Sequence, residues 1–254
     1  MQLLRNIPEV LPQPCVATIG FFDGVHRGHR YLIEQVREVA VVHGFASGVV
    51  TFPVHPRKVV QPEYHPELLT AYEEKVALLA ETGLDYCMML DFTPEVAILS
   101  AKEFMLFLYN HYNIRALVIG YDHRFGHNRS EGFDDYVRYG QELGIEVILA
   151  HAYIDKDVAV SSSVIRQLLS EGNVSEAASC LGYDYFLNGI VVSGYRVGRK
   201  IGFPTANLRV DDPDKLVPSD GVYAVRVTVA GQSYGGMLSI GSVSYTHLRA
   251  HETS

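Results

Sequence analysis

The stretch Cys15–His29, CVATIGFFDGVHRGH, decides the fold of the first half of the chain. It begins with the apolar run Cys15–Ile19, passes through a glycine-rich turn and leads into a helical pattern over His29–His43. Glycine lets the backbone come close to a phosphate group, and a helix N-terminus offers free N–H groups to it. The sequence therefore predicts a strand, a phosphate-holding turn and a helix.

Further apolar runs of strand length alternate with helical patterns up to about residue 150. Runs that are apolar on both faces fit a buried parallel sheet, so we expect a doubly wound, Rossmann-like α/β domain with ligands at the carboxyl ends of its strands. Two helices open with capping-box spacing, Thr70 with Glu73 and Ser100 with Glu103. The expected strands are Gly48–Phe52, Tyr86–Leu90, Ala116–Ile119 and Glu146–Leu149, and the expected helices are Thr70–Thr82 and Phe104–Tyr112.

The pattern changes near Ser161. Two short helices are expected first, one over SSSVIRQLLSEG and one from Asn173 to Leu181. Alternating residues over Gly221–Ala230, a turn at Gly231-Gln232 and a run over Ser233–Ile240 then indicate a small antiparallel β-barrel. We place a domain boundary near Gly182, which gives domains of 1–182 and 183–243.

The composition excludes several classes of protein. With 21 basic and 29 acidic residues the net charge is −8, so we expect no nucleic-acid partner. No apolar run reaches membrane-spanning length, and the N-terminus lacks the apolar core of a signal peptide. The three cysteines are far apart without a CxxC pair, which indicates a reducing compartment and a cytoplasmic protein. The oligomeric state stays open.

His26 and His29 are the first candidates for chemistry. Residues three apart at a helix start share one face, so both rings can donate hydrogen bonds to phosphoryl oxygens and stabilise charge during transfer. Two alternatives stay open: the histidines merely cap a helix after a tight turn, or they form part of a zinc site. No cysteine or matched third ligand lies nearby in the sequence to support zinc.

The string GFFDGVHRGH resembles the GxFDGxHxGH signature of the FAD synthetase branch of the HxGH nucleotidyltransferases. SSSVIR, Ser161–Arg166, resembles the segment with which this family clamps the triphosphate. Taken alone it favours an ordinary helix N-cap with a solvated arginine, and only its pairing with the first motif favours the clamp. The resemblance implies His26, His29 and Arg166 as catalytic residues. It implies nucleotide binding by Gly20, Phe21, Phe22, Asp23, Gly24, Gly28, Ser161 and Ser162, with Asp23 shaping the loop or contacting the nucleotide rather than acting as a base.

Two further loops resemble the flavin-binding loops of the same family. TFPVHPRKVV, Thr51–Val60, is similar to a mobile loop that implies Phe52 and His55 as flavin contacts. VIGYDHRFGHNRSEG, Val118–Gly132, is similar to a loop that implies polar contacts and stacking from Asp122, Arg124 and Phe125. The alternative for the second loop is ordinary loop polarity.

The segment Gly198–Leu208, GRKIGFPTANL, resembles the phosphate-binding region of riboflavin kinase. The resemblance implies ATP and Mg²⁺ binding by Gly198, Arg199, Lys200, Thr205 and Asn207, with Thr205 and Asn207 as the metal ligands. A hydroxyl and a carboxamide oxygen suit a hard cation that keeps several waters. The alternative is a basic surface turn followed by a strand.

The resemblance stops after about Val243, where the family continues with a Pro-Thr segment, a strand carrying a glutamate base and a helix. Residues 244–254 resemble read-through of a sequencing adapter, so we expect a non-native tail and an incomplete, inactive kinase domain.

The resemblance as a whole implies a bifunctional enzyme of flavin cofactor synthesis. Its first domain transfers AMP from ATP to FMN, giving FAD and pyrophosphate; its second converts riboflavin and ATP to FMN, and Mg²⁺ assists. Two other functions stay open: another HxGH adenylyltransferase, or a non-catalytic module that binds flavin or nucleotide.

Overall fold

A computed structural model describes residues 1–5, 10–61, 63–120, 123–127, 130–155, 158–193, 205–241 and 246–251. The chain divides into two compact units, Met1–Ser162 and Ser163–Ser254, and each is described by itself. The domain limits expected from the sequence, 1–182, 183–243 and 244–254, stay a prediction. No helix among the described residues is long and apolar enough to cross a membrane.

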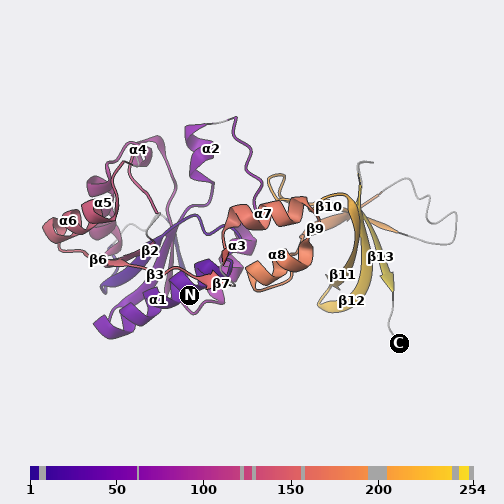
Figure 1. Ribbon diagram of the computed structural model, residues 1–254, viewed down its shortest axis with the longest axis horizontal. Helices are drawn as coiled ribbons and strands as arrows, with labels where there is room; N and C mark the ends of the chain where they lie inside the picture. The colour runs from indigo at the N-terminus through magenta and orange to yellow at the C-terminus, as the bar shows by residue number, and fades with distance from the viewer. Residues whose placement is uncertain are drawn as a thin grey trace. The chain divides into compact units, whose positions relative to one another are not determined.

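The first unit is built on a parallel sheet with the strand order β1-β4-β3-β2-β5-β6 (Figure 1). The central strands are buried along almost their whole length, which explains why their sequences are apolar on both faces. The expected strands all form, although the sequence did not reveal the first strand. The strands are β1 (Gln2–Arg5), β2 (Cys15–Ile19), β3 (Ala46–Thr51), β4 (Tyr86–Met89), β5 (Ile114–Ile119) and β6 (Glu146–Leu149).

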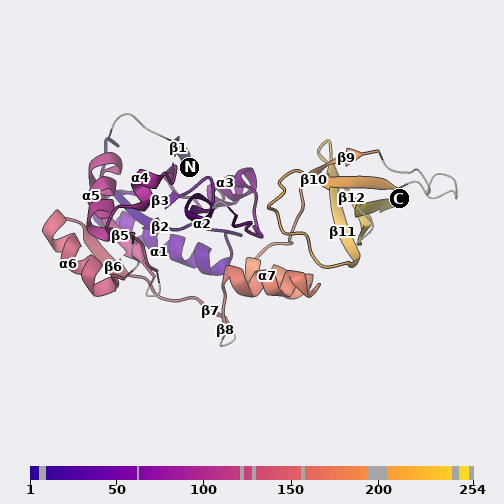
Figure 2. The ribbon, with the colours of Figure 1, turned by 90° about the horizontal axis from the view of Figure 1, so that it is seen from above.

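Helices cover both faces of this sheet, which confirms the α/β fold. The residues Cys15, Ala17 and Ile19 of β2 join a core cluster with α5 and α6. Helix α1 packs against β2 and β3, on the side of the strands away from α5 (Figure 2). The helices of this unit, with the short α2 and α4, are α1 (Arg27–His43), α2 (Pro56–Val60), α3 (Tyr72–Ala80), α4 (Pro94–Ala97), α5 (Ala101–Tyr112) and α6 (Phe133–Leu143).

The sheet order has its switch point between β2 and β5. From β2 the chain proceeds to β3 on one side, whereas β5 lies on the other side of β2. The loops after β2 and β5 therefore diverge above the sheet, and a ligand crevice forms where strand order reverses in this way. Both segments singled out in the sequence, Gly20–His29 and Tyr121–Gly126, follow these two strands.

Only one of the two expected capping boxes exists. Glu103 accepts from the Ser100 backbone N–H at 2.8 Å, and the Ser100 hydroxyl accepts from the Glu103 N–H at 3.3 Å. The Thr70–Glu73 box was wrong, because α3 begins at Tyr72 after the N-cap Ala71. The hydroxyl of Thr70 instead donates to the buried carboxylate of Asp23 in the loop after β2. The helix therefore begins two residues after Thr70, at Tyr72.

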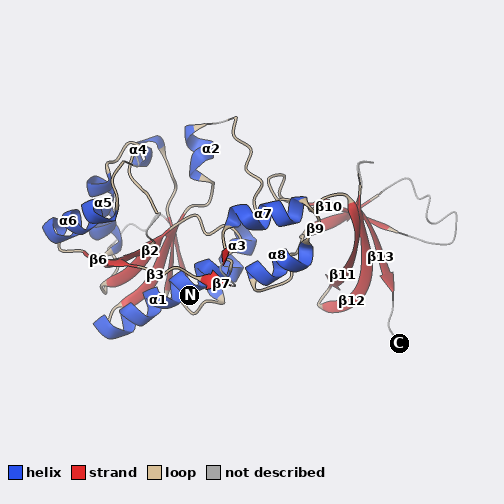
Figure 3. Ribbon diagram, in the orientation of Figure 1, coloured by secondary structure: helices blue, strands red, loops and turns tan. Residues whose placement is uncertain are grey.

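The second unit combines two helices with an antiparallel sheet of order β11-β12-β13-β10-β9 (Figure 3). This confirms the antiparallel character expected from the sequence. The antiparallel β7–β8 pair (Ile154–Asp155 and Val158–Ala159) belongs to the first unit. The remaining elements are α7 (Ser162–Ser170), α8 (Val174–Leu181), β9 (Gly189–Val192), β10 (Ala206–Val210), β11 (Gly221–Val229), β12 (Gln232–Ile240) and β13 (Thr246–His251).

The hairpin between β11 and β12 turns one residue earlier than expected. Val229 pairs with Gln232, so the turn consists of Ala230 and Gly231 rather than Gly231-Gln232. Both turn residues have positive φ, 48° and 79°. A two-residue hairpin turn of this kind matches the twist of the strands, and that match outweighs the cost of placing an alanine in the left-handed region.

Strand β13 lies within the segment expected to be a non-native tail. It pairs with β10 on one side and β12 on the other, so the sheet is continuous there. Backbone pairing is open to almost any sequence, and the origin of residues 244–254 therefore stays a prediction.

Candidate active site

The loop after β2 holds a strained backbone. Phe22, Gly24 and Val25 have φ values of 56°, 81° and 36°. Each non-glycine residue in this region costs about 1–3 kcal/mol and persists only where its surroundings enforce it. Phe22 and Val25 are buried, with 2% and 0% of their surface exposed, so their side chains anchor the strained turn in the core.

Asp23 fixes the same loop through hydrogen bonds to the segment that precedes α3. Its buried carboxylate accepts from the backbone N–H groups of Leu69 and Thr70, at 2.9 and 3.1 Å, and from the Thr70 hydroxyl at 3.2 Å. The Thr70 hydroxyl oxygen in turn accepts from the Gly24 N–H at 3.1 Å. In the structure Asp23 therefore shapes the loop, and its carboxylate is occupied by the segment that leads into α3.

His26 and His29 stack at the start of α1. Their ring centroids are 3.6 Å apart with an interplanar angle of 18°. His26 is the N-cap of the helix, and its Nδ1 accepts from the His29 backbone N–H at 3.3 Å, so the proton of a neutral His26 ring lies on Nε2. The two rings thus lie together on one face, as the spacing in the sequence indicated.

His29 is held neutral by its surroundings. Burial lowers its pKa well below 6.5, and electrostatic interaction with His26 and Lys75 lowers it further. Its Nδ1 is buried without a hydrogen-bond partner among the described residues. A neutral imidazole at a helix N-terminus can donate one hydrogen bond to an anion without being a charged acid. The described residues contain no group of three or more His, Cys, Asp or Glu side chains that could hold a metal ion.

Gly28 leaves room for this arrangement. A Cβ atom there would lie 3.2 Å from the ring of His26 and 3.3 Å from the carbonyl oxygen of Val160. Those distances are tighter than ordinary van der Waals contact, so a larger residue would displace the ring or the backbone. The absence of a side chain lets the start of α1 pack against the chain that leads into the SSSVIR segment.

The SSSVIR segment meets the loop after β2 through its serines. The Ser162 hydroxyl donates to the carbonyl oxygen of Asp23 at 3.0 Å. This contact places Ser162, the last residue of the first unit, beside the loop after β2, and it engages the hydroxyl that the resemblance assigned to the nucleotide. Ser161 is half-buried beside it. Arg166 lies half-buried on α7 in the second unit, so its predicted role toward the histidines stays a prediction.

The loop after β3 brings His55 to the loop after β2. The ring of His55 meets that of Phe21 edge-on at 4.7 Å and that of Tyr64 at 5.5 Å. The Arg57 guanidinium lies over Tyr64, 4.3 Å from the ring centroid. Phe52, by contrast, packs into the core against Phe92, with centroids 5.4 Å apart. His55 is therefore at the site, whereas the ring of Phe52 supports the loop from below.

The loop after β5 is anchored through Phe125. Its ring stacks on Tyr136 with centroids 4.1 Å apart, and its N–H donates to the Tyr136 hydroxyl at 3.1 Å. Gly126 has a φ of 88°, and a Cβ there would lie 2.6 Å from the Ala101 nitrogen. Arg124 is half-buried and donates to the His123 carbonyl at 3.1 Å. Asp122 lies outside the described residues, and the flavin contacts of this loop stay a prediction.

Sequence reasoning missed Lys75, which the structure places directly under the site. Its side chain is 2% exposed and donates to the carbonyl oxygens of Phe21 and Phe52, at 3.2 and 2.7 Å. The signal was present in the sequence: Lys75 occupies the i position of a buried i, i+3, i+4 set completed by Leu78 and Leu79. A lysine on the apolar face of a helix needs partners, and here those partners are the two loops.

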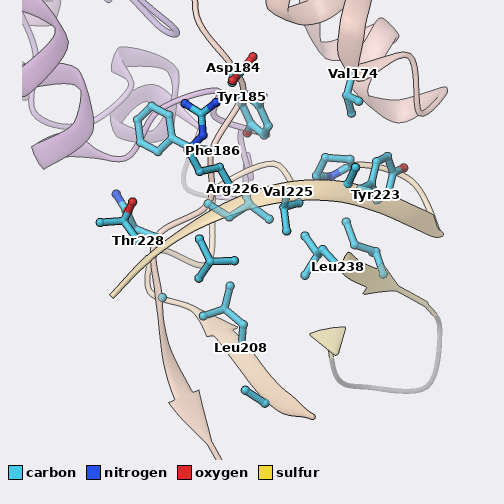
Figure 4. A pocket seen from close by; sticks show the side chains of 18 of the residues that line it. Val174, Asp184, Tyr185, Phe186, Leu208, Tyr223, Val225, Arg226, Thr228 and Leu238 are labelled. Atoms are coloured by element: carbon cyan, nitrogen blue, oxygen red, sulfur yellow. The ribbon is translucent and has the colours of Figure 1, made fainter. Parts of the chain in front are cut away.

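The second unit contains a concave site of about 1010 Å³ between α8 and one face of the sheet (Figure 4). Thr205 lies at this site. Asn207 is buried on β10, and its Oδ1 has no hydrogen-bond partner among the described residues. Gly198, Arg199 and Lys200 lie outside the described residues. Other lining residues are Tyr185, Phe186, Leu208, Tyr223, Val225 and Leu238.

Family models match both units. Residues 9–164 match FAD synthetase, and residues 181–253 match riboflavin kinase. The crystal structure named "Macrolide-efflux Protein from Streptococcus pneumoniae" is similar with a TM-score of 0.85 and 32% identity, over 96% of this chain and 82% of that one.

Curated relatives agree with these models. The bifunctional riboflavin kinase/FMN adenylyltransferase of Escherichia coli K12 is 36% identical over 95% of this chain and 78% of its own length. The protein of the same name from Bacillus subtilis is 34% identical over 89% of this chain and 71% of its own. With both family models matched in order along one chain, the chain belongs to the family of bifunctional riboflavin kinases/FMN adenylyltransferases.

Proposed function

We propose that the first unit transfers AMP from ATP to FMN, giving FAD and pyrophosphate. The observation that carries this proposal is the stacked pair of His26 and His29 at the start of α1, directly after a strained, buried loop at the switch point of the sheet. Such a loop and helix start suit a triphosphate, since the N–H groups and the rings converge on one place.

The transfer needs no nucleophile from the protein. A phosphate oxygen of FMN attacks the α-phosphorus of ATP, the new P–O bond forms, and the bond to the bridging oxygen breaks so that pyrophosphate leaves. The protein positions the groups and stabilises the charge that develops on them. In this proposal His29, neutral at pH 7, donates a hydrogen bond to a phosphoryl oxygen, as does Nε2–H of His26, and Arg166 supplies a charged fork.

The second unit fits the phosphorylation of riboflavin by ATP. Thr205 and Asn207 would hold Mg²⁺, and the buried Asn207 Oδ1 without a described partner is the kind of oxygen that a hard cation takes. When bound, Mg²⁺ neutralises charge on the phosphate groups. The aromatic and aliphatic lining of the adjoining concave site suits a flat ring system.

Product analysis tests both activities. The purified chain is incubated with ATP, Mg²⁺ and either FMN or riboflavin, and the flavins are separated by chromatography. We expect FAD from FMN. Formation of FMN from riboflavin reports on the second unit separately. The sequence predicts that its kinase is inactive, so we expect no FMN from riboflavin.

The His29→Ala variant tests the mechanism. Loss of one preorganised donor lowers kcat by roughly 100- to 1000-fold. The matched control is His111→Ala on α5, whose ring stacks on Phe107 away from the loop after β2. FAD formation by His29→Ala at the parent rate would contradict the mechanism. A chain that binds ATP and FMN without forming FAD would instead support a non-catalytic module.

These substrates are small molecules, and the cytoplasm is the compartment that fits them. Cys15 and Cys87 are buried thiols whose pKa values burial raises to about 12 and about 11, which keeps them protonated and unreactive.

A further inference from the structure

Lys75 connects two loops that have no covalent link near the site. Its ammonium group donates to the carbonyl oxygen of Phe21, in the loop after β2, at 3.2 Å. It also donates to the carbonyl oxygen of Phe52, at the end of β3, at 2.7 Å. The same nitrogen lies 3.9 Å from the centroid of the Phe21 ring. One buried cation therefore sets the distance between the two loops.

The contact extends outward through a series of rings. Phe21 lies between the Lys75 ammonium group and the ring of His55, which in turn meets Tyr64. A shift of the Lys75 ammonium group would therefore move the Phe21 ring, which the His55 ring of the loop after β3 contacts. Among the described residues, the only other side-chain donor to either carbonyl oxygen is the Thr51 hydroxyl, which donates to Phe21, so the ammonium group is the main side-chain restraint on both.

The charge of Lys75 faces other titratable groups. Asp23 of the loop after β2 and Cys87 of β4 each raise its pKa, but burial outweighs them and lowers the pKa to about 8. On α1, His29 feels the Lys75 charge, which helps to lower its own pKa. Lys75 therefore loses its proton within a range of pH in which enzyme assays are practical.

We propose that Lys75 is a positioning residue for adenylyl transfer, whose ammonium group holds the loop after β2 and the loop after β3 in the one arrangement that brings phosphate and acceptor together. The inference rests on the function proposed above. Lys75 contacts no substrate in this proposal; it acts through the backbone of Phe21 and Phe52.

Replacement by methionine tests the position. Lys75→Met keeps the length and the apolar stem but removes the donors. We expect kcat/KM for FMN adenylylation to fall by about 10- to 100-fold, because a misplaced loop loses alignment of the reacting groups. The matched control is Lys102→Met on α5, an exposed lysine paired with Glu142, which should keep the parent value. Parent activity in Lys75→Met would overturn the proposal.

The pH profile separates positioning from a merely structural role. In the parent enzyme kcat/KM should fall as pH rises above about 8, where the free enzyme loses the Lys75 proton. In Lys75→Arg the guanidinium keeps its charge, so this alkaline limb should move upward by at least about one pH unit. The same alkaline limb in both enzymes would overturn the proposal, and this comparison holds even if Lys75→Met fails to fold.

Hydrogen exchange gives a readout that does not need activity. In Lys75→Met we expect faster amide exchange over residues 20–26 and 52–60, with unchanged exchange in α5 and α6 on the other face of the sheet. If the parent chain forms no FAD from FMN, the proposed function fails while this comparison still decides whether Lys75 restrains the loops. Unchanged exchange in both loops would overturn the restraint itself.

Discussion

The loops after β2 and β3 leave neighbouring strands at the same edge of the sheet, but different kinds of contact hold them. The loop after β2 is fixed by buried groups: the side chains of Phe22 and Val25 and the carboxylate of Asp23. In the loop after β3, Lys75 holds the first residue, Phe52, and the rest is fixed by half-buried rings and the Arg57 guanidinium, with His55 and Tyr64 at its centre. The first loop is therefore costly to move, whereas the second is not beyond Phe52.

This difference matches the needs of the proposed reaction. Donors that stabilise a transferring phosphoryl group must be in place beforehand, since reorganising them during the reaction costs free energy. A loop that admits and covers an acceptor must open on the time scale of turnover, and such loops belong to the least stable parts of a protein. The predictions below perturb the fixed loop first and the adaptable loop last.

The largest effect is expected for Asp23→Ala. The change leaves the N–H groups of Leu69 and Thr70 buried without their acceptor. Loss of a buried charged acceptor costs about 3 kcal/mol of unfolding free energy, and the strained loop would relax as well. Urea denaturation followed by circular dichroism measures the loss. FAD formation should fall with it, because the loop carries His26 and His29.

Asp23→Asn is the control for this prediction. Its Oδ1 can still accept from both N–H groups, so the loss should be nearer 1 kcal/mol. Equal losses in the alanine and asparagine variants would show that charge, rather than the shape of the loop, is what Asp23 contributes.

The next-largest effect is expected for Lys75, whose ammonium group lies between the two loops. The pKa of Lys75 is about 8 in the folded chain and about 10.4 when unfolded. Between these values the unfolded chain binds a proton that the folded chain has released, so stability rises with pH. From pH 7.5 to 9 the parent should gain about 1 kcal/mol relative to Lys75→Met. Urea titrations at both pH values measure this difference.

Two groups oppose this trend at higher pH. The pKa values of Cys15 and Cys87 are raised in the folded chain, so stability from these groups falls as pH rises above about 9. Because the parent and Lys75→Met both contain these thiols, the difference in unfolding free energy between the two chains reports on Lys75. Above about pH 8, kcat/KM of the parent should fall while the Lys75 contribution to the unfolding free energy rises. A kcat/KM that rises together with the unfolding free energy would contradict the positioning role.

Gly28→Ala should separate geometry from stability within the fixed loop. Alanine favours a helix by about 1 kcal/mol over glycine, which offsets the tight contact of its Cβ with the His26 ring. We expect an unfolding free energy close to that of the parent but a roughly tenfold lower kcat, because the stacked rings must shift. Steady-state kinetics and urea denaturation of one preparation measure both. A fully active variant would show that the rings tolerate displacement.

The fold of the first unit was readable from the sequence because its strands are apolar on both faces. Runs such as Cys15–Ile19 fit a buried parallel sheet, and the glycine-rich turn that follows predicts the start of a helix. Strand β1 escaped detection because QLLR is short and only Leu4 is buried. The start of α3 was misplaced because Thr70 carries a capping signal that the fold uses for a contact with distant Asp23.

The arrangement of the motif residues was predictable where it depends on local geometry and not where it depends on long-range contacts. His26 and His29 stack because they are three apart on one helix, which the spacing states directly. The ring of Phe52 packs in the core and the Ser162 hydroxyl donates to Asp23, contacts that the sequence did not indicate, and the ligand roles of both residues stay predictions. Lys75 was missed because its partners lie 54 and 23 residues away.

The smallest effect is expected in the adaptable loop. Tyr64→Ala removes the ring between His55 and the Arg57 guanidinium, contacts worth about 0.5–1 kcal/mol at a half-buried position. Since these contacts close the loop rather than hold the core, global stability should change by less than about 0.5 kcal/mol. Loop opening should become more frequent, and KM for FMN should rise by a few-fold with kcat retained. Tyr64→Phe keeps both ring contacts and should behave as the parent does. A loss of stability in Tyr64→Ala as large as that in Asp23→Ala would mean that both loops are held equally, and the contrast between a fixed and an adaptable loop would be wrong.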